Sequence, residues 1–351
     1  MKPGPALSPP VAVLATGMVT GVGSSAAATC AALRCAMAHF VETRFRDQAG
    51  EWIRGSTVIL DKPWQGRAKL IHLVAPAISE CLVEAANIRT EEIPLILCLP
   101  EMDRPGRLEG LDESLLADVG RALNHQFHPQ STIICRGRVA GADAVLRARK
   151  LIHEAGRPFC IVAGVDSYLI TSTLHAYEEQ IRLLTSENSN GFLPGEGGTA
   201  VLLGHAKRHA GPELLCLGIG FGQEKATVNS EEPLRGDGLS EAVRKACAEG
   251  GRGLQDVNYR LADLSGEQYG FKEAALAISR TVRVLKPEFD IWHPGGFLGE
   301  LGAAIGPCVL GVALTAARKG YAPGDGVLCH FSNDDGARAA MILRYDEVRA
   351  A

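Results

Sequence analysis

The sequence lacks several features that would assign a function directly. None of its ten cysteines lies in a CxxC pair or in a cysteine–histidine spacing typical of metal sites. No apolar run approaches the roughly 20 residues of a membrane span, and the start is not a basic-then-apolar leader. Acidic and basic residues are interspersed at a net charge of −4, without a basic stripe or a charged tail. We therefore expect a cytoplasmic protein with free thiols that binds no metal, nucleic acid or membrane.

The chain has enough apolar residues for a large core. It contains 351 residues, of which 46% are hydrophobic, which suits one large α/β domain or two fused ones. Apolar runs of four to seven residues alternate with segments of helical period, and this alternation favours a mostly parallel sheet. Residues 1–10, "MKPGPALSPP", predict a disordered arm.

The order of these segments repeats along the chain. Residues 11–205 begin with the strand-like "VAVLATG" and end with "GTAVLLG", whereas residues 206–351 contain "LLCLGIGFG" and "RAAMILR" in the same places. The third helix-like segment ends in "RARK" in the first half and in "TAARK" in the second, and a strand follows each. The repetition predicts two similar βα halves, 11–205 and 206–351.

A glycine-rich segment near the start is a candidate cofactor loop. "ATGMVTGVGSS" has the TGxxxGxG spacing of short-chain dehydrogenases, in which glycines let the backbone approach a pyrophosphate. Those enzymes also need Tyr-x-x-x-Lys, and none of the six tyrosines has a lysine four places on. A tight turn between a strand and a helix is the preferred interpretation, and no cofactor is expected.

A second loop, "SNGFLPGEGGTAVLL", is more specific. Its Gly195, Glu196 and Gly197 place an acid between two glycines at the mouth of a buried strand, which a simple turn does not explain. The segment resembles "DGFVxGEGAGVLVL" of the β-ketoacyl-acyl-carrier-protein synthases, the condensing enzymes of the thiolase fold. "ADAVLRARKLIHEAGRPFCIVAGVDS", "PLRGDGLSEAVRKACAEGG" and "ELGAAIGPCVLGVALTAA" are also similar to that family, and the resemblance covers most of Val11 to Leu343. It implies a thiolase-like fold, with the two halves giving a layered α-β-α-β-α core, and a dimer.

The residues that match the family's catalytic positions are changed. Aligning "AGADAVLRA" puts Arg138 on the cysteine nucleophile, and "VNYRLADLSGEQYG" puts Asp263 on the first histidine. In "PGGFLGELGAAIG", Pro294 falls on the lysine and Gly299 on the second histidine. A guanidinium has no lone pair to attack a thioester, and an ionised aspartate would repel the enolate that the histidines stabilise. The resemblance therefore assigns no catalytic residue.

Neighbouring residues are candidates for a remodelled pocket. Cys135 is a possible relocated nucleophile, although its place in a strand favours a buried thiol. Arg138 and Asp263 either form a buried salt bridge that plugs the old site or turn outward to solvent. The full candidate set is Cys135, Arg136, Arg138, Asp263, His293, Glu300 and Asn333.

Two functions follow from the resemblance. The first is a partner or accessory subunit without condensing activity, which pairs as a homodimer, or as a heterodimer with another thiolase-fold subunit. The alternative is an active 3-oxoacyl-acyl-carrier-protein synthase or acyltransferase with a relocated nucleophile such as Cys135, or with a new constellation that involves His293, Glu300 and Asn333. An acyl-carrier protein or an acyl-coenzyme A is a further candidate partner in either case.

Overall fold

The computed structural model describes residues 7–85, 88–206 and 211–346. Its strands are β1 (Val11–Thr20), β2 (Val41–Arg46), β3 (Trp52–Gly55), β4 (Leu95–Leu99), β5 (Thr132–Cys135), β6 (Phe159–Ser167), β7 (Glu196–His205), β8 (Glu213–Gln223), β9 (Tyr259–Ala262), β10 (Ile291–Trp292), β11 (Gly326–Ser332) and β12 (Ala337–Asp346). Its helices are α1 (Ala26–Arg34), α2 (Gly66–Glu84), α3 (Leu111–Leu123), α4 (Ala140–His153), α5 (Thr171–Glu179), α6 (Asp237–Gly250), α7 (Gln268–Thr281), α8 (Gly295–Leu298) and α9 (Ile305–Arg318).

Two groups of five strands share one topology. The order is β5-β4-β6-β7-β1 in the first half and β10-β9-β11-β12-β8 in the second, so each half follows the order 3-2-4-5-1 when its strands are numbered along the chain. In each half the last strand, β7 or β12, runs antiparallel to both of its neighbours, and the other pairs are parallel. The prediction of two similar halves is confirmed; the residue at which they divide stays a prediction. The prediction of a mostly parallel sheet is wrong: β1 and β8 also pair antiparallel, so five of the nine strand pairs in the described ten-stranded sheet are antiparallel.

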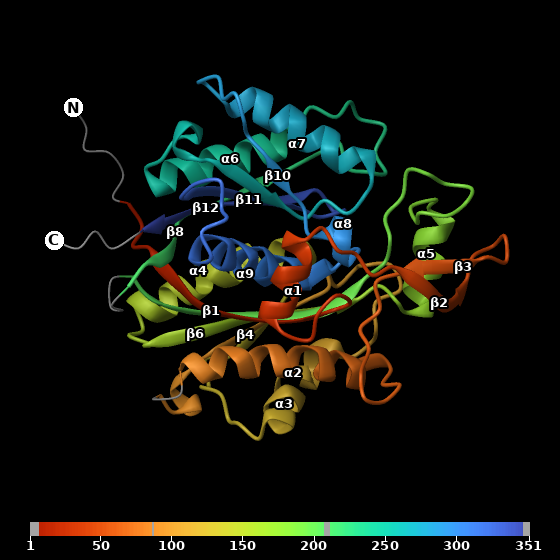
Figure 1. Ribbon diagram of the computed structural model, residues 1–351, viewed down its shortest axis with the longest axis horizontal. Coiled ribbons are helices and arrows are strands. Elements are labelled where there is room, and N and C mark those ends of the chain that lie inside the picture. Colours follow the sequence, from red (N-terminus) through yellow and green to blue (C-terminus); the bar gives the residue numbers. More distant parts are fainter. Residues whose placement is uncertain (1–6, 86–87, 207–210, 347–351) are drawn as a thin grey trace.

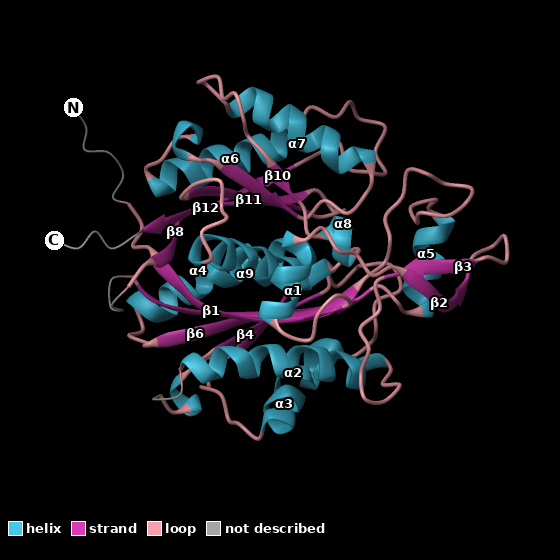
Figure 2. Ribbon diagram, in the orientation of Figure 1, coloured by secondary structure: helices cyan, strands magenta, loops and turns pink. Residues whose placement is uncertain are grey.

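The elements stack in five layers. Figure 1 shows α2 and α3 below the first group of strands, α4 and α9 between the two groups, and α6 and α7 above the second. Figure 2 shows the same alternation of helix and strand layers. The predicted α-β-α-β-α core is therefore confirmed. The layers also explain why β4, "LILCL", is apolar throughout: both of its faces are covered, and all five of its residues are buried.

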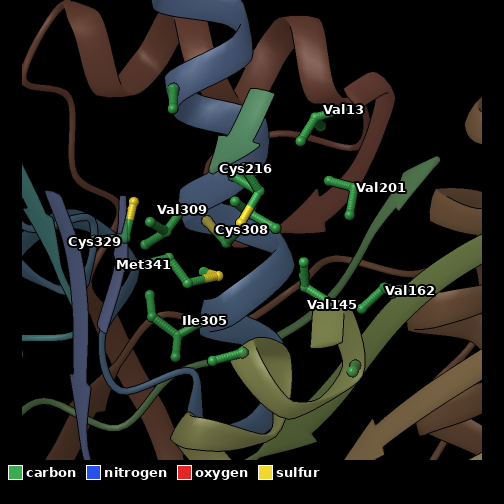
Figure 3. Close-up of a cluster of buried hydrophobic side chains, with 14 of the residues drawn as sticks. Val13, Val145, Val162, Val201, Cys216, Ile305, Cys308, Val309, Cys329 and Met341 are labelled. Carbon is green, nitrogen blue, oxygen red and sulfur yellow. The ribbon is translucent and has the colours of Figure 1, made fainter. Parts of the chain in front are cut away.

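The central layer joins the two halves. Eleven of the 14 residues of α9 are buried, as expected for a helix that is enclosed on all sides. The core around it takes side chains from both halves (Figure 3), and those labelled there are Val13, Val145, Val162, Val201, Cys216, Ile305, Cys308, Val309, Cys329 and Met341. A Cβ placed on Gly141 of α4 would lie 2.7 Å from Cα of Gly306 in α9, so the two helices touch through their backbones.

Three parts of the structure were not predicted as separate elements. The hairpin of β2 and β3 forms a small sheet of its own, and α5 packs beside it (Figure 1). α3 lies in the outer layer with α2. These segments follow neither the repeat nor the alternation of long apolar runs, which is why the sequence pattern did not reveal them.

The structure describes only the last residues of the predicted disordered arm, and the expected absence of membrane spans and metal sites can be compared with the described residues alone. Residues 1–6 of the arm lie outside the described residues, whereas Ser8 donates a hydrogen bond to Glu249 and the Pro10 carbonyl lies 3.0 Å from Nε2 of His153. In the described part of the chain, no helix is long and apolar enough to cross a membrane. The same residues contain no group of three or more histidine, cysteine or acidic side chains placed to hold a metal ion.

Candidate functional site

The elbow between β5 and α4 positions Arg138. A 3-10 turn, Gly137–Val139, links the strand directly to the helix. Gly137 has φ +50°, and a Cβ there would lie 2.0 Å from the carboxyl group of Glu101, so only glycine fits this turn. The turn directs Arg138 inward, where its side chain keeps only 11% exposure.

Three carboxylates surround the Arg138 guanidinium. Its Nη2 lies 2.5 Å from Oδ1 of Asp334, and its Nη1 lies 3.2 Å from Oε2 of Glu300. Oδ2 of Asp263 is farther away, 3.9 Å from Nε. The outward orientation considered from the sequence is therefore wrong for both side chains. Arg138 and Asp263 do face each other in the interior, but Asp334 and Glu300 lie closer to the Arg138 guanidinium than Asp263 does.

Backbone and side-chain donors hold these acids in place. Glu300 accepts hydrogen bonds from the Ser265 hydroxyl at 2.7 Å and from the Gly302 amide at 2.9 Å. Asp263 accepts one from the Ser332 amide at 2.7 Å. Because each acid already has a second partner, the cluster is a built structural network rather than a set of free groups.

Asn333 ties the elbow to the loop after β11. Its Oδ1 accepts from the Val139 amide at 3.2 Å, and its Nδ2 donates to the Arg136 carbonyl at 3.0 Å. The amide side chain therefore bridges both sides of the arginine turn. Arg138, Asp263, Glu300 and Asn333 are the predicted pocket residues that the structure brings together.

A second arginine, Arg182, extends the network. It binds Glu267 in a bidentate manner at 2.8 and 2.7 Å, and its Nη1 lies 2.6 Å from Oδ2 of Asp334. The hydroxyl of Tyr177 donates to the same Asp334 oxygen at 3.3 Å. Asp334 thus bridges two guanidinium groups. The sequence reasoning missed both Asp334 and Arg182, although the unusual "FSNDDGA" segment contained the first of them.

Burial and charge set opposite pKa shifts in this cluster. Burial alone would raise the pKa of Asp334, but Arg138 and Arg182 outweigh it and hold that pKa well below its usual value. Burial raises the pKa of Asp263 to about 7, against the opposing effect of Arg138. Burial likewise raises the pKa of Glu101 to about 7. The arginine therefore has one firmly ionised partner, Asp334, whereas Asp263 and Glu101 have pKa values raised to about 7.

Little free space remains beside Arg138. The cavity at this point has a volume of about 40 Å³. It is lined by Arg138, Arg182, Val228, Asp263, Leu264, Ser265, Glu267, Tyr269, Gly270, Ser332, Asn333 and Asp334. A space of this size holds little more than a single water molecule. It does not hold an acyl chain.

The other three predicted pocket residues lie outside the cluster around Arg138. Cys135 ends β5 half-buried; burial raises the pKa of its thiol, and Arg107, whose Nη2 is 3.6 Å from the sulfur, only partly opposes this. Arg136 is 45% exposed and pairs with Asp143 at 3.0 Å. The ring of His293 packs against Phe271, and burial lowers its pKa.

The remaining family positions have no side chain suited to catalysis. Pro294 precedes α8, and Gly299 follows it with φ +71°. A Cβ on Gly299 would lie 2.8 Å from the carbonyl oxygens of Leu193 and Pro194, so the close approach of that loop requires glycine. The loop in turn fixes Glu300, whose amide donates to the Leu193 carbonyl at 2.8 Å.

The acid of the glycine loop has a structural explanation. Glu196 is fully buried between Gly195 and Gly197, and Nζ of Lys69 lies 2.6 Å from its Oε1. It also accepts hydrogen bonds from the Val58 amide at 2.9 Å and the Ser167 hydroxyl at 2.8 Å. The side chain thus fastens the start of β7 to α2 and to the end of β6.

Comparison with known proteins identifies the fold. No protein-family model matches the chain. The actinorhodin polyketide beta-ketoacyl synthase 2 of Streptomyces coelicolor is 27% identical over 222 residues, which are 59% of this chain and 53% of that protein. The match therefore spans about half the length of that curated relative.

Solved structures match nearly the whole chain. The ishigamide ketosynthase/chain length factor is 18% identical with a TM-score of 0.71, covering 95% of this chain and 99% of that one. A ketosynthase in complex with its chain length factor from Xenorhabdus doucetiae is 14% identical with a TM-score of 0.71, covering 96% and 98%. A ketosynthase complex with a type II PKS acyl-carrier protein gives a TM-score of 0.78 at 14% identity, covering 96% and 99%. The predicted thiolase-like ketosynthase fold is confirmed.

Proposed function

The chain has the thiolase-like fold of the ketosynthases and is similar in sequence to a β-ketoacyl synthase, and we propose that it is a partner subunit without condensing activity. One observation carries the proposal: at the elbow where the resemblance places a nucleophilic cysteine, Arg138 is buried among Asp263, Glu300 and Asp334. An arginine cannot form a thioester, because its guanidinium stays protonated and has no free electron pair. Binding and shaping a partner is a role of this fold that needs no nucleophile at the elbow.

The surroundings of the elbow support the same proposal. The cavity of about 40 Å³ excludes an acyl substrate. None of the described residues that line it is a histidine, and the acids among them would repel a developing enolate whenever they are ionised. Restoring condensation would therefore require opening the pocket as well as replacing the arginine.

The edge strand β5 is the surface that we propose for pairing. It is the outermost strand of the first half, hydrogen-bonded only to β4, and all four of its residues are partly exposed. An open edge can accept a strand from another subunit, which would continue the sheet across the interface. Because β5 leads directly into the elbow, a partner there would lie next to Arg138.

A second candidate function is an acyltransferase that uses Cys135 on an acyl-carrier-protein or acyl-coenzyme A thioester. The observation in its favour is the Arg107 guanidinium, 3.6 Å from the sulfur. Against it stands the raised pKa of the thiol, which keeps sulfur in its unreactive protonated form at neutral pH.

Two measurements test the proposal together. Octanoyl-coenzyme A is incubated with the purified protein, and the intact mass is recorded for wild type and Cys135→Ser. We expect no covalent adduct with either. An adduct on the wild type that disappears in Cys135→Ser would replace the proposed role with the acyltransferase.

The second measurement concerns the partner. The tagged chain is purified from cells that express it, and co-purifying proteins are identified by mass spectrometry. We expect a thiolase-fold ketosynthase with its active-site cysteine in about equal amount, as in a dimer of two related chains. Ile134→Glu in β5 should abolish pairing, whereas Ile59→Glu, at a side chain that is 85% exposed elsewhere, should not. Purification of a wild-type monomer from such cells would contradict the proposal.

A further inference from the structure

Arg260 is an arginine without an ion pair that lines a groove. The buried arginines of the described residues all pair with carboxylates: Arg104 with Asp166, Arg149 with Glu249, Arg182 with Glu267, and Arg338 with Glu273. Arg260, in β9, is half-buried, and no carboxylate of the described residues lies within ion-pair distance of it; the exposed carboxylate of Asp290 acts on its charge only from farther away. Its Nε is buried without a hydrogen-bond partner. A guanidinium in that position is costly unless something else neutralises it.

The groove that Arg260 lines is apolar. It lies along α7 and the edge strand β10, on the second half of the molecule, and has a volume of about 490 Å³. The residues that line it are Arg260, Leu264, Phe271, Ala274, Ala275, Ile278, Ser279, Val282, Leu285, Lys286, Phe289 and Ile291. Two of them are cations and none is an acid. This volume and this mixture of surfaces are typical of sites for small amphipathic ligands.

Of the two cations, Arg260 is the one that can still donate a hydrogen bond to a ligand. Nζ of Lys286 already donates to the carbonyls of Val257 at 2.5 Å and Gln255 at 3.3 Å. Arg260 donates through Nη2 to the Phe289 carbonyl at 2.7 Å, and its guanidinium stacks on the Phe289 ring at 4.8 Å. These contacts fix the orientation of the guanidinium, enclose its Nε, and leave Nη1 without an acceptor among the described residues. The arginine is therefore preorganised to receive an anion.

We propose that this groove binds a medium-chain aliphatic carboxylate, with the carboxylate on Arg260 and the chain along the apolar face of α7. The charge of the ligand compensates the unpaired guanidinium. Its chain covers apolar side chains that are otherwise open to solvent, among them Phe271 at 37% exposure and Leu285 at 92%. The site is separate from the pairing surface at β5, although Leu264 lines both this groove and the small cavity beside Arg138.

The chain-length dependence of binding is the first test. Hexanoate, octanoate and decanoate are titrated into the purified full-length protein by isothermal calorimetry. Each added methylene that becomes buried should tighten the dissociation constant by about three- to fourfold, the equivalent of ~0.8 kcal/mol. Decanol, which has the chain without the charge, should bind at least about tenfold more weakly than decanoate. Failure of decanoate to bind at millimolar concentration would refute the proposal.

Two variants separate the roles of charge and shape. Arg260→Gln should weaken decanoate by about 10- to 100-fold and leave decanol unchanged, because only the carboxylate uses the guanidinium. Ala275→Trp, at an exposed position on α7, should fill the groove and weaken both ligands without disturbing the fold. Arg252→Gln, beside a different depression, is the matched control and should change neither. Decanoate binding that is indifferent to both Arg260→Gln and Ala275→Trp would mean nonspecific adsorption and would overturn the site.

Discussion

At the residue scale, Arg138 controls the charge balance of the elbow. Asp334, Glu300 and Asp263 face one guanidinium, and Arg182 shares only the first of them. A cation enclosed by acids does not by itself add stability, because desolvation offsets the attraction. Its removal, however, leaves buried carboxylates without a counter-charge. The arginine is thus needed to compensate the charge of the acids around it. The network as a whole need not add to the stability of the fold.

We expect Arg138→Met to lower the free energy of unfolding by about 3–5 kcal/mol. The loss should be non-additive with that of Asp334→Asn, with a coupling of about 0.5–3 kcal/mol, because the two groups are in direct contact. Urea unfolding of the wild type, both single variants and the double variant measures this. Lys245→Ala, in an exposed pair with Glu241, is the control and should change stability little. Strictly additive losses would show that the pair does not form.

A pH dependence follows from Asp263. Its pKa rises from 3.8 to about 7 on folding, because burial disfavours the charged form. The folded state therefore binds the proton more tightly than the unfolded state does. The contribution of Asp263 to the free energy of unfolding is fully present below about pH 4. It is lost as the pH rises through 7, at up to ~1.4 kcal/mol per pH unit. Unfolding free energies measured between pH 4 and 8 should show this decline. Asp263→Asn should make the decline shallower without abolishing it, because Glu101 has a pKa raised to about 7 as well; Asp61→Asn, at an exposed acid, should leave the slope unchanged.

At the element scale, the crossing of α4 and α9 depends on two glycines. A Cβ on Gly141 would lie 2.7 Å from Cα of Gly306, closer than real contacts allow, so Gly141→Ala must separate the helices. We expect a loss of about 1–3 kcal/mol, although alanine is otherwise the better helix former. Gly270→Ala in α7 meets only the δ-methyl group of Leu264 and should be close to neutral. Thermal unfolding compares the two; equal effects would exclude the backbone contact as the cause.

The elements also show which parts of the structure the sequence could predict. The long apolar strands and the helices that accompany them follow simple periodicities, so the layered α/β core and its repeat were predictable. The turn at Arg138 was predictable because the glycine and the helix around it match a known pattern. Its partners were not, since Glu300 and Asp334 lie 162 and 196 residues away and no local pattern pairs them.

The positions of Cys135 and His293 outside the cluster around Arg138 have the same physical origin. Cys135 and His293 were considered for the pocket because each lies within a few residues of a family position. Within such a distance a strand or turn can direct a side chain to either face, and here Cys135 packs against Arg107 and His293 against Phe271. The sequence locates the neighbourhood of a site, whereas the orientation of each side chain depends on packing between distant segments.

At the scale of the whole molecule, the two halves share one core and should unfold together. Figure 3 shows Val145 and Val201 of the first half packed with Cys308 and Met341 of the second around α9, so neither half can expose its inner face and remain folded. We predict one transition in urea for far-UV circular dichroism and for tryptophan fluorescence. A Trp52→Phe, Trp64→Phe variant leaves Trp292 as a probe of the second half, and Trp292→Phe is the matched probe of the first. The midpoints from the two probes, each compared with circular dichroism of the same variant, should coincide. A lower midpoint for one probe would mean that the halves are independent domains, and the shared central layer would then contribute little to stability.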